Sequence, residues 1–268
     1  ADAFKGIIET ESGKRFGPFD LVIDCLGVRS PLTRSPRKEL PYGALWATLP
    51  WPETGPFNST ALEQRYKAAS QMAGVMASGR TRQGAPLSLT YFWSIKGDRE
   101  KAWRTSPLDQ WKDEAASLWP ETITLLDQIT SHDQLAFARY RHRTHPDPVS
   151  GRRLVHLGDA WHAASPQLGQ GANMALLDAW ALHKALETTD SLGDALQCYK
   201  VARRGHVRLY QIMTWAFTPV YQGDGKLAPW LRDWLAAPLS RIWPAPPLLA
   251  IMVSGMLGWP LRRLRLDR

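Results

Sequence analysis

Two short motifs in the second half of the chain carry residue types that suit a polar, electron-rich ligand. One is Gly158-Asp159, a carboxylate preceded by a glycine, and the other is the loop Gly169-Gln170-Gly171. A carboxylate can accept hydrogen bonds from a pair of hydroxyl groups, and glycines let a ligand approach the backbone closely. The pattern predicts a site for a ligand with neighbouring hydroxyls and an anionic or carbonyl-rich part.

A strand and a helix must position these motifs. The apolar run Leu154, Val155 and Leu157 predicts a strand that ends at Gly158-Asp159. The segment from Ala172 to Glu187 lacks Gly and Pro and is rich in Ala and Leu, which predicts a helix beginning just after Gly171. Free N–H groups in the first turn of a helix, together with its dipole, attract an anionic or carbonyl group. Asp159 would lie at the carboxyl end of its strand, where open α/β sheets bind ligands.

This region resembles the second FAD signature of the class A flavoprotein monooxygenases, which include the aromatic and ubiquinone-type hydroxylases. That signature reads approximately Gly-Asp-Ala-x-His, then Pro, then Gly-x-Gly-x-Asn-x-Ala, then a downstream Asp. The matching positions are Gly158, Asp159, Ala160, His162, Pro166, Gly169, Gly171, Asn173, Ala175 and Asp178. An ordinary strand-to-helix turn would not need so many matches in so short a segment.

The resemblance implies a role for each position. Asp159 would bind the ribitol of FAD, and the backbone amides around the loop would face the flavin pyrimidine. Pro166 would lie beside the flavin ring on the reaction face, and His162 would lie near the flavin, more as a hydrogen-bonding group than as a general base. The expected cofactor-binding residues are Gly158, Asp159, Pro166, Gly169, Gln170, Gly171, Ala172, Asn173 and Met174, with Pro166 and His162 as catalytic candidates.

A weaker match precedes them at Asp24 to Ser30. In the family the comparable stretch ends Gly-Ala-Asp-Gly-x-x-Ser, with its Asp near the FAD pyrophosphate. Here Gly27, Arg29 and Ser30 fit, but Leu26 replaces the Asp, and Asp24 lies two positions earlier. Gly27 and Arg29 are therefore added to the expected cofactor contacts, while the role of the carboxylate stays open.

By the same resemblance, NAD(P)H would reduce the flavin, and dioxygen would form a flavin hydroperoxide that hydroxylates an aromatic or quinone-like small molecule. The family's ADP-binding unit, with its Gly-x-Gly-x-x-Gly fingerprint, does not occur in the sequence, which begins at Ala1. We therefore expect an α/β (mixed α+β) chain that forms the C-terminal portion of a Rossmann-like FAD/NAD(P)-binding flavoprotein, with a substrate-covering β-sheet layer and C-terminal helices.

The remaining pattern predicts the order of elements. Strands are expected at residues 4–10 and 15–24 around a Gly13 turn, and at 42–49, 87–95 and 134–141; helices are expected at 107–118, 193–217 and 248–257. Residues 64–78 suit either a helix or a strand. The expected domains are 1–30 and 151–217 for FAD, 31–150 for a substrate-binding sheet with a Trp- and Tyr-rich roof, and 218–268 for C-terminal helices.

Composition narrows the alternatives. The net charge is +8, but the Arg clusters at 139–143, 203–204 and 262–268 do not follow one aromatic face, so nucleic acid is not expected. Cys25 and Cys198 give no disulfide framework, which fits a cytoplasmic protein. The pairs His142 and His145, and His156 and His162, lack zinc-like spacing, and no Gly-x-Ser-x-Gly motif surrounds Ser30 or Ser165.

The C-terminal stretch from Ile242 to Leu261 contains no charge and has Trp243 and Trp259 near its ends. Pro244, Pro246 and Pro247 argue against a membrane span, so the segment would pack against the body of the protein, against a second subunit in a homodimer, or on a membrane surface. Two other functions stay open: a flavin-dependent reductase, cyclase or halogenase, and a truncated non-catalytic chain with a membrane-surface or interaction role.

Overall fold

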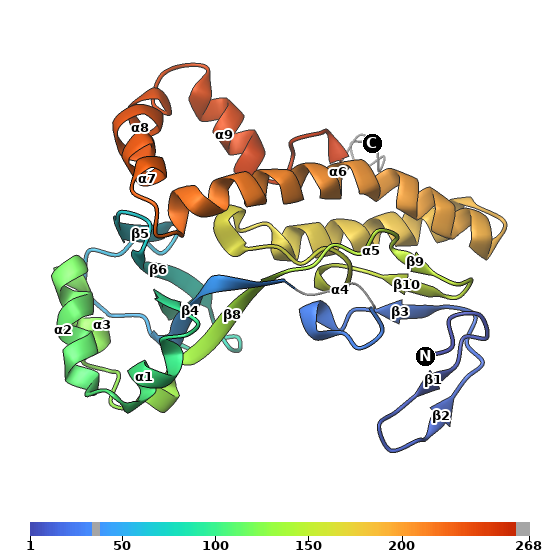
Figure 1. Ribbon diagram of the computed structural model, residues 1–268, viewed down its shortest axis with the longest axis horizontal. Coiled ribbons are helices and arrows are strands. Elements are labelled where there is room, and N and C mark those ends of the chain that lie inside the picture. Colours follow the sequence, from blue (N-terminus) through green and yellow to red (C-terminus); the bar gives the residue numbers. More distant parts are fainter. Residues whose placement is uncertain (34–37, 261–268) are drawn as a thin grey trace. The chain divides into compact units, whose positions relative to one another are not determined.

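The computed structural model describes residues 1–33 and 38–260, and the chain divides into two compact units (Figure 1). Unit 1 contains residues 1–38, 141–217 and 236–268; unit 2 contains residues 39–140 and 218–235. The arginines expected to cluster at 262–268 lie outside the described residues. Each unit is formed from segments distant in sequence, and the predicted C-terminal region 218–268 is divided between them.

Unit 1 contains a two-stranded sheet and a three-stranded sheet, and two long helices pack on the three-stranded one. Its strands are β1 (Ile8–Glu9), β2 (Arg15–Phe16), β3 (Val22–Asp24), β9 (Val149–Ser150) and β10 (Leu154–His156). Its helices are η1 (Gly27–Arg29), α4 (Asp159–His162), η4 (Pro166–Leu168), α5 (Gly171–Thr188), α6 (Leu192–Tyr221), which extends into unit 2, α8 (Ala237–Leu239) and α9 (Ala245–Val253).

The central strand of that sheet joins two distant segments. In the order β3-β10-β9, β10 pairs parallel with β3, so that His156 lies opposite Asp24. Figure 1 shows α5 and α6 lying along this sheet. Val155 and Leu157 pack with Leu177 and Leu182 of α5 and with Tyr199 of α6 in one apolar core. The burial of these side chains fixes the position of the α5 N-terminus relative to the end of β10.

Unit 2 contains a five-stranded sheet, and several of its helices pack on one face of that sheet. Its order is β5-β6-β7-β4-β8. The strands are β4 (Lys38–Pro50), β5 (Leu62–Lys67), β6 (Gln71–Gly79), β7 (Ser88–Lys96) and β8 (Ala136–His142). The helices are α1 (Glu100–Thr105), α2 (Leu108–Leu118), η2 (Pro120–Thr122), α3 (Ile123–Leu126), η3 (His132–Gln134), α7 (Leu227–Leu231) and the π-helical turn η5 (Arg232–Ala236).

Alternation along β4 and β7 separates the two faces of this sheet. Leu45 and Trp93 are cross-strand partners, and both pack in the core with Trp111 of α2. The next pair, Trp46 and Phe92, faces the other way because successive side chains of a strand alternate. Trp46 is 49% exposed there. The sheet therefore has a helix-covered face and an open face with a large aromatic side chain.

Most of the predicted elements are present, with changes at their ends. The Gly13 hairpin is confirmed, but residues 4–10 contain only the two-residue β1, and residues 15–24 divide into β2 and β3. The ambiguous residues 64–78 form most of the β5–β6 hairpin. The last helix was predicted at 248–257, but α9 spans Ala245–Val253. It begins earlier because Pro246 and Pro247 can lie in the first turn of a helix, where no N–H donor is needed.

Among residues 1–33 and 38–260, no helix combines the length and apolar character needed to cross a bilayer.

Candidate FAD-binding site

The segment between β10 and the start of α5 and the facing side of α6 form the walls of a cavity of about 270 Å³, here called the loop cavity. Its lining includes Asp159, His162, Pro166 and the whole segment from Gly169 to Gly171. Gly169 has a left-handed φ of +64°, which closes the 3₁₀ turn η4, and nothing lies within 4 Å of an added Cβ at Gly169 or Gly171. The predicted glycine loop therefore presents open backbone to the cavity.

The N-terminus of α5 is not capped by any side chain. Its first backbone N–H groups, from Gly171, Ala172 and Asn173, have no earlier turn of helix to bind. These donors and the positive end of the helix dipole favour a carbonyl-rich or anionic ring. The donor set predicted from the sequence is thus present, and it matches the pyrimidine edge of a flavin.

A second cavity of about 350 Å³, here called the glycine cavity, lies on the other side of Asp159. It is lined by Gly27 and Cys25 from the loop after β3, and by small residues from Gly158 to Ala179. The parallel pairing of β3 with β10 brings these two segments together. Backbone and small side chains on both walls permit close approach of an extended ligand. Asp159 borders both cavities.

The Asp159 side chain is solvent-exposed as a whole, yet desolvation by the cavity walls raises the pKa of its carboxyl above the usual value. The nearby His162 acts in the opposite direction. No hydrogen bond of the described residues occupies this carboxylate. Asp159 is therefore available to hydroxyl groups of a ligand.

A buried polar network supports the loop from below. His162 Nε2 donates to Asp178 Oδ2 at 2.6 Å, and the Gly158 N–H donates to the same oxygen at 2.9 Å. Arg203 Nε donates to Asp178 Oδ1 at 2.7 Å, and Arg203 also donates to His206 Nδ1 at 2.8 Å. Desolvation, the largest influence, raises the pKa of Asp178, but the bonds from His162 and Arg203 outweigh it and lower the pKa below the usual value. The charge on Asp178 is therefore balanced by its partners.

The sequence pointed to Asp178 as a motif position but gave no reason to connect it with Arg203. Both side chains are fully buried, although they lie on different helices. A buried Arg without a partner is unfavourable, so an Arg on an apolar helix face is the signal that could have predicted an acidic neighbour.

Gln170, Asn173 and Met174 use their side chains for structural contacts. Gln170 donates to the Val253 carbonyl, and Asn173 Nδ2 donates to the Ser254 carbonyl at 3.2 Å, so both hold the C-terminal end of α9. Met174 is buried against Arg203. Any contact of Gln170 or Asn173 with a ligand would therefore be made by the backbone.

The loop after β3 differs from the expectation at its carboxylate. Asp24 is 1% exposed and accepts hydrogen bonds from Ser30 Oγ and His156 Nδ1, each at 2.7 Å, so it supports the loop and does not line either cavity. Leu26 is 62% exposed. Gly27 lines the glycine cavity, whereas Arg29 is exposed and lines neither cavity, so its cofactor contact stays a prediction.

No group of three His, Cys, Asp or Glu side chains suited to a metal ion occurs in the described ranges 1–33 and 38–260. The two cysteines are free and exposed.

Comparison with known proteins identifies a family for this chain. The profile of the FAD binding domain family matches residues 60–208. An FAD-dependent monooxygenase, ntnJ, from Nectria sp is 33% identical over 122 residues, which are 44% of this chain and 29% of that protein. Kynurenine 3-monooxygenase from Xanthomonas campestris is 34% identical over 110 residues, which are 38% of this chain and 23% of that protein.

The crystal structure of Klebsiella pneumoniae HpxO with FAD and uric acid superimposes with a TM-score of 0.72 at 17% identity, over 95% of this chain and 64% of that one. At this identity the likeness shows the fold. The matched segments are about a quarter of the length of these curated relatives. Asp159 and the glycine loop line one cavity, and the family profile matches more than half of the residues of this chain. The chain therefore belongs to the FAD binding domain family.

Proposed function

We propose that this chain is the major part of a monooxygenase that uses FAD, NAD(P)H and dioxygen to hydroxylate an aromatic or quinone-like small molecule. The observation that carries the proposal is the uncapped α5 N-terminus beside the free carboxylate of Asp159, both on one cavity. This arrangement suits a flat, carbonyl-bearing ring joined to a chain of hydroxyls.

The residues present fit FAD in the following way. Asp159 would accept hydrogen bonds from the ribityl hydroxyls, and the amides of Gly171, Ala172 and Asn173 would face the pyrimidine carbonyls. Gly27 would allow the phosphate-bearing part to pass over the loop after β3. When bound, FAD supplies the redox chemistry, which includes the activation of dioxygen by its reduced form.

The chain's own residues would orient the ring and exclude water. Pro166 lies on the loop cavity without a backbone N–H, so it offers an apolar edge to the reaction face. His162 keeps its Nε2 hydrogen bonded to Asp178 and holds the loop, which supports a positioning role rather than a proton-transfer role. Donors fixed by a rigid, buried network need no rearrangement when negative charge develops on the reduced ring.

The open face of the unit 2 sheet supports an aromatic substrate. Trp46 and Phe92 are cross-strand neighbours on that face, and Leu62 and Met76 are exposed cross-strand partners on β5 and β6. Flat apolar surfaces of this kind stack on aromatic rings and exclude water. Uric acid in HpxO and 2-aminobenzoylacetate in Pseudomonas aeruginosa PqsL are ring compounds bound by proteins of the same fold.

The test is a turnover measurement on protein expressed from its complete reading frame and reconstituted with FAD. We expect a flavin absorption spectrum, oxidation of NADH or NADPH that is stimulated by a phenol or quinone, and a product heavier by one oxygen atom in mass spectrometry. Flavin reduction without an oxygenated product across a broad panel would favour a reductase, cyclase or halogenase. Protein that cannot be reconstituted with FAD would contradict the proposal.

A surface role is also supported by one observation. In unit 1, the uncharged helix α9 and the residues around it expose large apolar side chains. Their exposed fractions lie between 56% and 81% for Ile242, Trp243, Leu248 and Trp259. Apolar and tryptophan side chains on a basic protein favour the interface of an anionic membrane. We propose that this segment makes peripheral membrane contact.

A further inference from the structure

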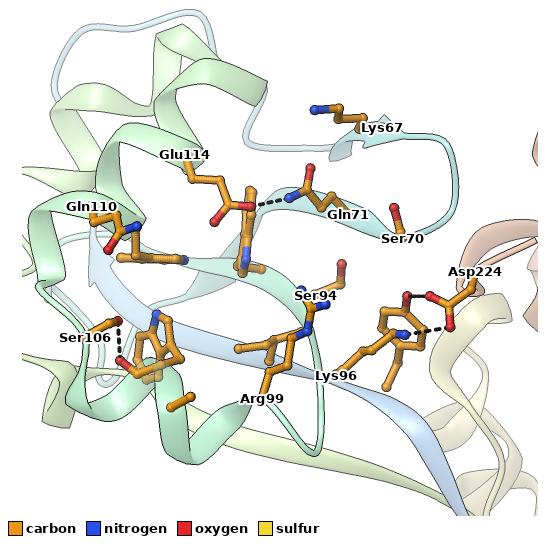
Figure 2. Close-up of a pocket in the computed structure, with 16 residues that line it drawn as sticks. Lys67, Ser70, Gln71, Ser94, Lys96, Arg99, Ser106, Gln110, Glu114 and Asp224 are labelled. Carbon is orange, nitrogen blue, oxygen red and sulfur yellow. Dashed lines mark hydrogen bonds and ion pairs between the residues drawn. The ribbon is translucent and has the colours of Figure 1, made fainter.

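Unit 2 contains a separate cavity of about 740 Å³, here called the tryptophan cavity after Trp93, Trp103 and Trp111 in its wall (Figure 2). It is formed by the end of β7, the turn between β5 and β6, and the helices α1 and α2. Its volume lies within the range of roughly 300–1,000 Å³ that is usual for small-molecule sites. Every lining residue belongs to unit 2.

The cavity lies largely on the side of the sheet opposite to the proposed substrate roof. Trp93 points to the helix-covered face, where it packs with Trp103 and Trp111, whereas Trp46 and Phe92 point to the open face. Trp103 and Trp111 lie edge to face, with ring centroids 5.8 Å apart. The three indoles form an apolar wall suited to a flat ligand. The site is therefore not explained by the hydroxylation site proposed above.

Two buried indole N–H groups in this wall have no hydrogen-bond partner in the described part of the chain. They are Trp103 Nε1 and Trp111 Nε1, on side chains that are 7% and 3% exposed. Native proteins rarely bury such groups unpaired. Indole nitrogens can only donate. The groups call for a ligand rich in hydrogen-bond acceptors.

The charges at the cavity favour an anion. Lys67 and Arg99 form no ion pair in the described residues, and Figure 2 draws them on opposite sides of the cavity. Asp224 accepts from Lys96 at 2.7 Å and from Tyr42 at 2.6 Å, whereas Glu114 accepts from the neutral Gln71 and keeps its charge. The charges of Lys67 and Arg99 together exceed that of Glu114, so the lining keeps a net positive charge for a ligand.

We propose that the tryptophan cavity binds a planar aromatic carboxylate. Its ring lies against the indoles of Trp103 and Trp111, and its carboxylate accepts hydrogen bonds from the guanidinium of Arg99. Arg99 suits this role because its planar fork matches a carboxylate. Lys67, across the cavity, adds a second positive charge.

The test is isothermal titration of the full chain with 2-naphthoate and indole-3-carboxylate, each compared with its neutral amide. We expect saturable binding of the acids and at least about tenfold weaker binding of the amides, because the amides lack the charge that Arg99 recognises. Arg99→Met should weaken binding of the acids by a similar factor. Trp111→Phe, which keeps a ring but removes the N–H, should weaken it less.

Lys112→Met is the matched control, since it removes a cation from α2 outside the cavity lining and should leave binding unchanged. Thermal unfolding of each variant checks that it is folded. Asp159→Ala should bind 2-naphthoate as the unaltered chain does, which separates this inference from the proposed FAD site. No saturable binding of either acid, equal binding of acids and amides, or an Arg99→Met variant that binds like Lys112→Met would overturn the proposal.

Discussion

His162 and Asp178 form a buried hydrogen bond of 2.6 Å that connects the short helix after β10 to the middle of α5. The same carboxylate binds the backbone N–H of Gly158 and the side chain of Arg203. One side chain thus holds both ends of the segment that carries Asp159 and the glycine loop.

Loss of the Asp178 carboxylate should strongly destabilise unit 1. Asp178→Ala leaves the buried Arg203 without its counter-charge, and breaking such a pair costs about 3–5 kcal/mol. Urea unfolding measures this change. Asp190→Ala, at an exposed Asp between α5 and α6, is the control and should stay within about 0.5 kcal/mol of the unaltered chain. Equal stability of the two variants would show that the network is not a support of the fold.

Stability should fall in acid. Desolvation raises the pKa of Asp24 and Asp178, but hydrogen bonds, chiefly from His156 to Asp24 and from His162 to Asp178, outweigh it, so both folded-state pKa values are lowered. Their stabilisation is complete above the unfolded-state pKa of about 3.9 and is lost as the pH falls through the lower folded-state values.

Urea unfolding at a series of pH values from 7 to about 2 tests this expectation, since the loss of stability should begin near the unfolded-state pKa of Asp. The free energy of unfolding should decrease below pH 4 or so, and Asp24→Asn should show a shallower decrease. A free energy of unfolding that does not change across this range would contradict the assigned balance of charges.

Two glycine substitutions should separate folding from cofactor binding. Gly158 has a φ of +56°, and an added Cβ would lie 2.9 Å from the Ala175 Cβ, so Gly158→Ala should destabilise the chain by about 1–3 kcal/mol. Gly171 has open space around its Cα, so Gly171→Ala should leave stability nearly unchanged and weaken FAD binding by obstructing the donors. Thermal unfolding and FAD titration of both variants measure the two effects. Unaltered FAD affinity in Gly171→Ala would argue against the loop as a contact.

The exposed segment around α9 should bind anionic vesicles. Trp243 is 81% exposed, and Trp243→Ser should reduce co-sedimentation with phosphatidylserine-containing vesicles because tryptophan favours the headgroup region. Leu176→Ser, at a 70% exposed position on α5, is the control and should bind as the unaltered chain does. If neither the chain nor the control sediments with vesicles, the membrane proposal fails.

Local patterns in the sequence predicted the elements better than their assembly. The helix after Gly171 begins within a residue of the expected position, because its apolar run and the preceding glycines are local signals. Residues 64–78 could not be assigned, since Gly74 lies on β6 beside Phe92 and only this pairing within the sheet decides for a strand. The start of α9 was placed too late because Pro246 and Pro247 occupy its first turn.

The sequence could suggest Asp159 and the glycine loop as a site because these residues form one continuous segment and line one cavity. The hydrogen bonds of Asp24 with His156 and of Asp178 with Arg203 could not be predicted, because the two residues of each pair lie on different elements that are distant in the sequence. The tryptophan cavity likewise depends on the packing of α1 and α2 on the sheet, which no local pattern in the sequence could predict.

The central claim is that Asp159 and the start of α5 hold FAD, and an FAD titration of the Asp159→Ala variant tests it most directly. A lost hydrogen bond to a charged group costs about 1.5–3 kcal/mol, which corresponds to roughly tenfold to hundredfold weaker binding. We expect that loss of affinity with unchanged thermal stability, while Asp190→Ala keeps full affinity. An Asp159→Ala variant that binds FAD as tightly as the unaltered protein would contradict the account.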